Sequence, residues 1–210
     1  MARQPKPDGR RTPRRESTLR RRPAYREPCV PILVVCGAKN TEPAYLKGLL
    51  ASVDNRAVSV TIKICAQDPV SVVRDAVTKR DMADGHYQQA WCVLDVDDFD
   101  HLDEALRLAA DEDVEVALSN PCFELWLLLH FRDHRANITG YGQAKQHLTS
   151  HHPNYSKVAR DFDFGRYRAG WQAAVERARK LARPGEEAKM NPSTGMWRLV
   201  QEVVPEDQRS

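Results

Sequence analysis

Two aspartates that closely follow an apolar segment are the clearest candidates for chemistry in this sequence. Asp95 and Asp97 are two residues apart, so in an extended chain both carboxylates point to the same side. Oxygen donors of this kind suit Mg²⁺ or Mn²⁺, since Mg²⁺ is usually held by one or two carboxylates together with water and substrate phosphate. A solvated acidic turn, with Asp98 or Asp100 capping the next helix, fits the same residues and remains the alternative.

Two glutamates extend this acidic set. Glu42 and Glu124 each fall in the first turn of a predicted helix, where the helix dipole favours an anion, and that simpler role is the alternative to a part in catalysis. The chain has no GxSxG motif for a nucleophilic serine and no GxGxxG or GxxxxGK[ST] phosphate loop. We therefore do not expect the chain to hydrolyse ATP by itself.

Strand-like and helix-like segments alternate four times between residues 30 and 131. Residues 30–36 form a continuous apolar, β-branched run, which is typical of a strand buried on both faces of a parallel sheet. Thr41 offers a hydroxyl to cap the first helix, and Ser119-Asn120-Pro121 is expected to cap the fourth. Further strands are predicted over 58–64, 90–94 and 114–118, and helices over 41–50, 69–77, 102–109, 123–131, 142–149, 167–182 and 196–203.

This alternation predicts an α/β fold, with a mainly parallel sheet flanked by helices and a helical C-terminal part. Ligands of such sheets bind beyond the carboxyl ends of the strands. Three loops should therefore meet at one rim of the sheet, namely residues 37–42, 95–100 and 119–124. All four candidate acids lie in these loops.

Length and composition favour one domain over residues 29–204, preceded by a tail over residues 1–28. No run approaches the ~18 apolar residues of a membrane helix, because the longest candidate, residues 122–131, is short and contains Glu124 and His130. No apolar core follows the basic N-terminus, so a secretory signal is not expected.

Five cysteines without a CxxC pair indicate reduced thiols, and we expect a cytoplasmic protein. His151 and His152 are expected to form a surface pair.

The tail concentrates positive charge. Residues 1–28 contain ten Lys and Arg against three acids, five prolines and almost no large aliphatic residues, whereas the rest of the chain has more acids than bases. Such a segment cannot bury enough apolar surface to order itself, so we expect disorder. It could bind nucleic acid through phosphate contacts, or serve only as a solubilising leader. The residues proposed to contact nucleic acid are Arg10, Arg11, Arg14, Arg15, Arg20, Arg21 and Arg22.

Four segments resemble one known family. Residues 34–46 resemble the C-E-G-x-x-T-E-P-x-Y opening of the RloB family, which includes the AbiLii abortive-infection proteins. Residues 95–99 resemble its D-x-D-D-F segment, and residues 119–131, SNPCFELWLLLHF, resemble its most distinctive stretch. The closing segment is matched by residues 191–194, followed by Leu199 and Val200. The resemblance covers about residues 29–204 and leaves the tail outside.

The resemblance implies a Toprim-like fold and a role in prokaryotic anti-phage defence beside an AAA-type ATPase. It also implies a Mg²⁺-dependent nuclease that acts on DNA or RNA phosphodiesters. In Toprim-like nucleases an Asp-x-Asp after the third strand holds the metal together with a glutamate after the first strand. Carried over by position, Asp95 and Asp97 match the Asp-x-Asp pair and Glu124 matches an acid of the family's long motif, so these three would hold the metal. Glu42 is a candidate catalytic acid that is not carried over by position.

One position departs from the family pattern. Gly37 stands where the family has glutamate after the first strand, and glycine has no side chain to bind a metal. Either Glu42 replaces that glutamate, or the chain is a catalytically inactive subunit that binds the ATPase or nucleic acid. If the site merely lost its glutamate, Gly37→Glu should strengthen metal binding.

Overall fold

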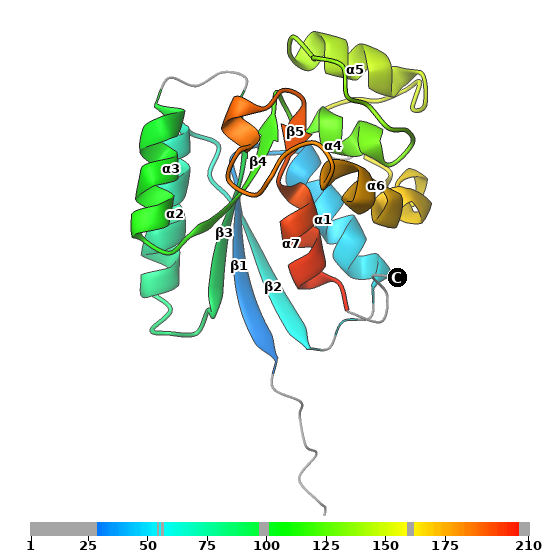
Figure 1. Ribbon diagram of the computed structural model, residues 1–210. Helices are drawn as coiled ribbons and strands as arrows, with labels where there is room; N and C mark the ends of the chain where they lie inside the picture. The colour runs from blue at the N-terminus through cyan, green and yellow to red at the C-terminus, as the bar shows by residue number, and fades with distance from the viewer. Residues whose placement is uncertain (1–28, 54, 56, 97–100, 159–161, 206–210) are drawn as a thin grey trace, which may run out of the picture.

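A computed structural model describes residues 29–53, 55, 57–96, 101–158 and 162–205. Its centre is a five-stranded sheet with the order β2-β1-β3-β4-β5 (Figure 1). The strands are β1 (Val30–Cys36), β2 (Val58–Ile64), β3 (Gln89–Asp95), β4 (Glu115–Asn120) and β5 (Ser193–Thr194). The first four strands run parallel, and β5 pairs antiparallel with the end of β4. The α/β class and the mainly parallel sheet are confirmed.

Helices cover both faces of the sheet (Figure 1). One face carries α2 and α3, whose buried residues form one apolar core with β1 and β3. The other face carries α1, α4, α6 and α7 over a second, larger core, and α5 packs on the outside against α4. The bounds are α1 (Thr41–Ser52), α2 (Pro69–Asp81), α3 (Leu102–Asp111), α4 (Glu124–Leu129), α5 (Tyr141–Thr149), α6 (Trp171–Ala178) and α7 (Met196–Val203).

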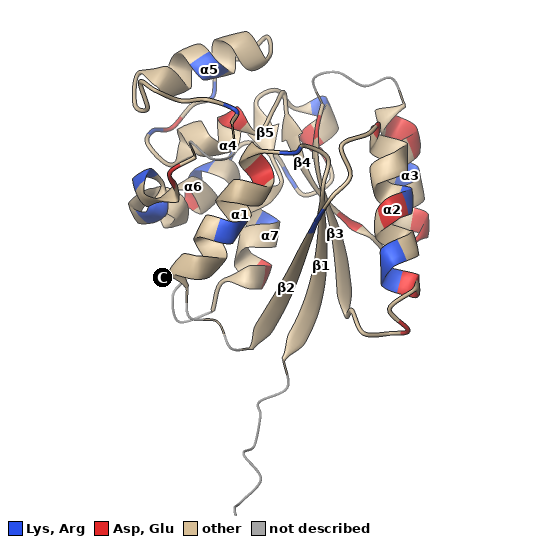
Figure 2. Ribbon diagram, turned by 180° about the vertical axis from the view of Figure 1, so that it is seen from behind, with Lys and Arg blue, Asp and Glu red and all other residues tan. Residues whose placement is uncertain are grey.

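Burial on both faces explains the unbroken apolar run of β1. Val34 and Cys36 point into the core beneath α1, while Leu33 and Val35 point into the core beneath α2. All four side chains are fully buried, as the sequence predicts for a central parallel strand. Charged residues instead lie on the outer faces of α2 and α3, as Figure 2 shows.

The helix α4 is buried on all sides. Every residue from Glu124 to Leu129 is buried, and Trp126 and Leu128 are completely inaccessible to solvent. This confirms the prediction that the apolar segment packs inside the molecule rather than on its surface. The segment therefore fixes the position of the acid at its first residue.

The starts of α1 and α4 differ from the prediction. Asn40, not Thr41, is the N-cap residue of α1, and its side chain makes no capping hydrogen bond. Ser119 and Asn120 belong to β4, and α4 begins only at Glu124 after a cis bond between Asn120 and Pro121. The reason is tertiary contact, because Ser119 and Asn120 pair with β5 instead of capping a helix.

Within the described part of the chain, no helix is both long and apolar enough to cross a membrane. The C-terminal part is helical as predicted, although its described residues also form β5 and short 3₁₀ turns over residues 164–166, 168–170 and 187–189. A strand of two residues carries too little pattern to be read from the sequence.

Candidate functional site

The strand order places the ends of β1 and β3 at the point where the chain reverses direction across the sheet. From β1 the chain proceeds to β2 on one side, while β3 lies on the other side of β1. In open parallel sheets, ligands bind beyond the carboxyl ends of the strands at such a switch point. Asp95 is the last residue of β3, and residues 37–40 connect β1 to α1.

Three of the four predicted acids meet on one face of the sheet at this point. Asp95 follows Val93 at a spacing of two, and Val93 belongs to the core beneath α1 and α4. Glu42 lies in the first turn of α1, and Glu124 lies in the first turn of α4. Both glutamates are buried. Asp97 lies outside the described residues, as do Asp98 and Asp100.

The pKa values of two of these acids respond to burial and to the charges of the others. Burial raises the pKa of Glu42 to about 7, and the negative charge of Glu124 adds to the effect. Burial also raises the pKa of Asp95 well above its ordinary value, with further contributions from Glu42 and Glu124. The Oδ1 atom of Asp95 is buried, which argues against full solvation of this carboxylate, whereas the other acids of the alternative acidic turn lie outside the described residues.

Two side chains from the segment after α5 contact the acid of α4. The hydroxyl of Tyr155 donates a hydrogen bond to Glu124 Oε1 over 2.7 Å. The ammonium group of Lys157 lies 3.5 Å from the same oxygen. Thr41 Oγ1 lies 3.5 Å from the Tyr155 hydroxyl, which links the start of α1 to this network.

Two carboxylate oxygens in the cluster have no hydrogen-bond partner among the described residues. They are Asp95 Oδ1 and Glu124 Oε2, and both are buried. Leaving a buried acceptor unpaired costs free energy, more so for a charged group. Carboxylate oxygens are the donors that Mg²⁺ and Mn²⁺ prefer, so the chemistry of these two atoms fits such a cation.

The described side chains do not form a complete cage for a metal. Among them, no group of three His, Cys, Asp or Glu is arranged closely enough to hold an ion. Mg²⁺ ordinarily keeps several waters and needs only one or two carboxylates, so this arrangement is compatible with it.

Gly37 faces away from the acids. A Cβ atom built on it would lie 3.2 Å from the backbone oxygen of Val93, 3.3 Å from Leu94 Cδ2 and 3.8 Å from Val72 Cγ2. Leu94 and Val72 belong to the core beneath α2, on the opposite face from Asp95. A glutamate at position 37 would therefore start on the wrong face, and Glu42 is the acid that this fold brings to Asp95.

Sequence reasoning missed Tyr155 and Lys157 because they lie in a polar stretch with no motif or periodicity. It also misplaced His152, which was expected on the surface beside His151. His152 is buried, and its Nδ1 lies 2.7 Å from the hydroxyl of Tyr167. The arginines proposed to contact nucleic acid, Arg10 to Arg22, lie outside the described residues.

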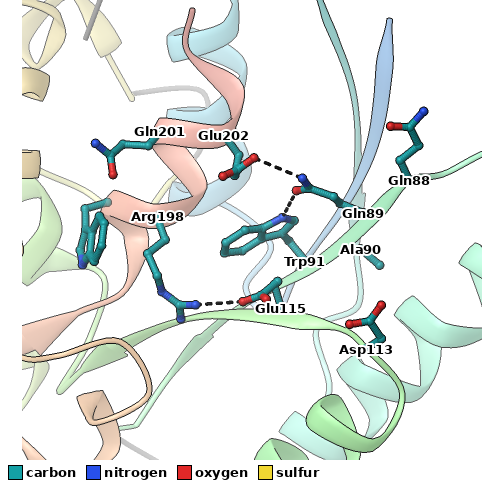
Figure 3. Close-up of a pocket in the computed structure, with 10 residues that line it drawn as sticks. Gln88, Gln89, Ala90, Trp91, Asp113, Glu115, Arg198, Gln201 and Glu202 are labelled. Carbon is teal, nitrogen blue, oxygen red and sulfur yellow. Dashed lines mark hydrogen bonds and ion pairs between the residues drawn. The ribbon is translucent and has the colours of Figure 1, made fainter. Parts of the chain in front are cut away.

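A hollow of about 440 Å³ lies at the opposite end of β3 from the acids (Figure 3). Its polar groups are largely paired with one another. Trp91 Nε1 donates to Gln89 Oε1 over 2.9 Å, and Gln89 Nε2 donates to Glu202 Oε2 over 3.2 Å. Arg198 Nη1 donates to Glu115 Oε2 over 2.9 Å. Because these groups already have partners, we regard the acid cluster, and not this hollow, as the candidate reactive site.

Comparison with known proteins identifies one family. A family model described as RloB-like protein matches residues 32–203, from within β1 to the end of α7, and the match includes all the acids named above. Neither a curated protein nor a solved structure matches the chain.

Proposed function

The chain belongs to the RloB-like protein family, and we propose that it is a Mg²⁺- or Mn²⁺-dependent phosphodiesterase that cleaves nucleic acid. The observation that supports this most is the cluster of Asp95 with the buried Glu42 and Glu124 at the switch point of the sheet, where burial and the neighbouring acids raise the pKa of Asp95 and of Glu42. Perturbed carboxylates of this kind gather at functional sites more often than elsewhere.

In this proposal Asp95, Asp97 and Glu124 hold the metal, and Glu42 acts beside them. When bound, the cation would neutralise charge on the phosphate and make an attacking water more acidic. Glu42, in the first turn of α1, would accept the proton of a water whose oxygen bonds to phosphorus. The bond from phosphorus to the leaving oxygen would break at the same time, and that oxygen would take a proton from solvent.

The proposal includes a role in anti-phage defence together with an AAA-type ATPase. It rests on what the RloB resemblance implies. It agrees with the absence of a phosphate-loop motif from the sequence, because ATP hydrolysis would then be supplied by the partner.

The second candidate is a catalytically inactive subunit that binds the ATPase or nucleic acid. The observation behind it is Gly37, which stands where the family has a glutamate. The position of Glu42 beside Asp95 weakens this alternative, since another acid is present in the cluster.

Calorimetric titration of Mn²⁺ and cleavage of labelled DNA and RNA together test the proposal. The wild-type protein should bind Mn²⁺ and cleave at least one nucleic acid, with and without the neighbouring ATPase as separate reactions. Asp95→Asn should lose both properties. Asp111→Asn, an exposed acid at the end of α3, is the matched control and should keep both. Metal binding without any cleavage would favour the inactive subunit, and absence of both would overturn the metal site.

A further inference from the structure

We infer that Lys157 is a catalytic residue of the proposed site, which contacts the phosphate of the substrate beside the metal. This inference deepens the proposed function and rests on it. Lys157 lies in the segment that follows α5, and it belongs to no sequence motif.

The position of its ammonium group is defined on two sides. Nζ lies 3.5 Å from Glu124 Oε1 and 3.8 Å from the centroid of the Tyr141 ring. A cation over an aromatic face is attracted to it, so the ring helps to hold the ammonium group beside the acids. The Glu124 side chain is 1% exposed, whereas that of Lys157 is 47% exposed. Lys157 therefore spans the distance from the buried cluster to solvent.

The ammonium group of Lys157 contacts one oxygen of Glu124 and leaves the other open. Glu124 Oε2 is buried and has no hydrogen-bond partner among the described residues, whereas Oε1 faces Lys157. The side chain of Lys157 therefore places a positive charge beside the acids without occupying the oxygen that a metal would use.

A phosphodiester needs such a cation here. The substrate is an anion, and the three acids would repel it unless positive charge offsets theirs. An ammonium group has three donors, of which the contact with Glu124 uses one. Lysine binds phosphate as a point charge and would lie at the solvent side of the site, where the substrate arrives.

The first test uses the small substrate bis(p-nitrophenyl) phosphate with Mn²⁺, because so small a substrate gains little from the basic tail. Lys157→Met should lower kcat about 100-fold, the usual effect of removing one group that stabilises developing charge. Mn²⁺ binding measured by calorimetry should persist, and Lys157→Arg should restore part of the rate. Lys145→Met is the matched control, because Lys145 Nζ lies 5.9 Å from the same Tyr141 ring. It should behave as the wild-type protein.

The second test measures binding without turnover. A fluorescent 12-nucleotide single strand is titrated into the Ca²⁺-loaded full chain at a salt concentration that screens the tail. Lys157→Met should weaken binding about 10-fold relative to Lys145→Met. If no variant cleaves but Lys157→Met still loses binding, the nuclease proposal fails and the phosphate contact stands. Equal rates and equal binding for the two methionine variants, or no binding by the loaded wild-type protein, would overturn the inference.

Discussion

Asp95 and Glu124 each bury one oxygen without a hydrogen-bond partner among the described residues, so their environment penalises charge when no cation is bound. We expect Asp95→Asn to unfold at the same or a higher temperature than the wild-type protein in EDTA at pH 8, because one source of repulsion is removed. Added Mn²⁺ should raise the melting temperature of the wild-type protein only, since binding to the folded state stabilises it. A variant that melts clearly lower in EDTA would show that the Asp95 charge supports the fold.

Gly37 gives a second prediction at this scale. We expect Gly37→Glu to lower the melting temperature and to leave Mn²⁺ affinity unchanged, because its Cβ would crowd Val93 and Leu94 on the face opposite the acids. Overpacking of this kind costs about 1–3 kcal/mol. Gly142→Glu is the control, since a Cβ there meets no atom within 4 Å. Stronger Mn²⁺ binding by Gly37→Glu, as the family pattern alone suggests, would refute the geometric argument.

The buried side chain of His130 should make the free energy of unfolding depend on pH. It is buried, and its Nδ1 lies 2.9 Å from the Trp126 carbonyl, which can only accept, so Nδ1 carries the proton and Nε2 accepts from the Tyr45 hydroxyl. Burial lowers the pKa of His130 from 6.5 to about 3. Below pH 6.5 the unfolded chain therefore binds a proton that the folded chain rejects, and stability falls as the pH decreases toward 3.

Between pH 7 and pH 4.5 the wild-type protein should lose about 3 kcal/mol more unfolding free energy than His130→Gln, since one pKa unit corresponds to about 1.4 kcal/mol. Urea unfolding at both pH values measures the difference. His86→Gln, at an exposed position, should follow the wild-type profile. Parallel profiles for wild type and His130→Gln would mean that the buried ring is charged or that it titrates alike in both states.

At the scale of elements, the approach of α1 to the short turn over Phe164–Arg166 depends on a missing side chain. A Cβ at Gly48 would collide with the Cβ and ring of Phe164. In an exposed helix Gly→Ala gains up to about 1 kcal/mol, but here we expect Gly48→Ala to destabilise the protein by about 1–3 kcal/mol. Lys47→Ala, at an exposed neighbouring position, should change stability little. Thermal and urea unfolding of the two variants provide the measurement, and a stabilised Gly48→Ala would contradict this close packing.

Elements were predictable where a local pattern sufficed. The bounds of β1, β2 and α7 agree with the sequence prediction, because long apolar or periodic runs determine them. The starts of α1 and α4 and the strand β5 depend on contacts between distant segments, which no local pattern encodes. The same reason explains why the acids could be predicted and their partners could not. Motifs identify Asp95 and Glu124, whereas Lys157 comes near them only through tertiary packing.

For the whole molecule, the two cores on either side of the sheet position the site. Asp95 ends a strand shared by both cores, and the acids of α1 and α4 approach it from the larger one. A framework of this kind holds three carboxyl groups near one another, which an isolated loop could not do. The partly exposed Lys157 then leaves the cluster open toward solvent on one side.

Residues 1–28 contain almost no large aliphatic residues, so deletion of that segment should leave the melting temperature unchanged within a few degrees. Nucleic-acid binding should instead weaken, since ten Lys and Arg of the chain lie there. Binding by the full chain should fall steeply with salt and show little sequence preference, because each neutralised phosphate releases counterions. Fluorescence anisotropy of labelled DNA and RNA at several salt concentrations, with the full and the shortened chain, measures this.

A solubilising leader predicts the opposite outcome, namely equal affinity and an equal salt slope for both chains. A large loss of melting temperature would show that the segment contributes to the fold.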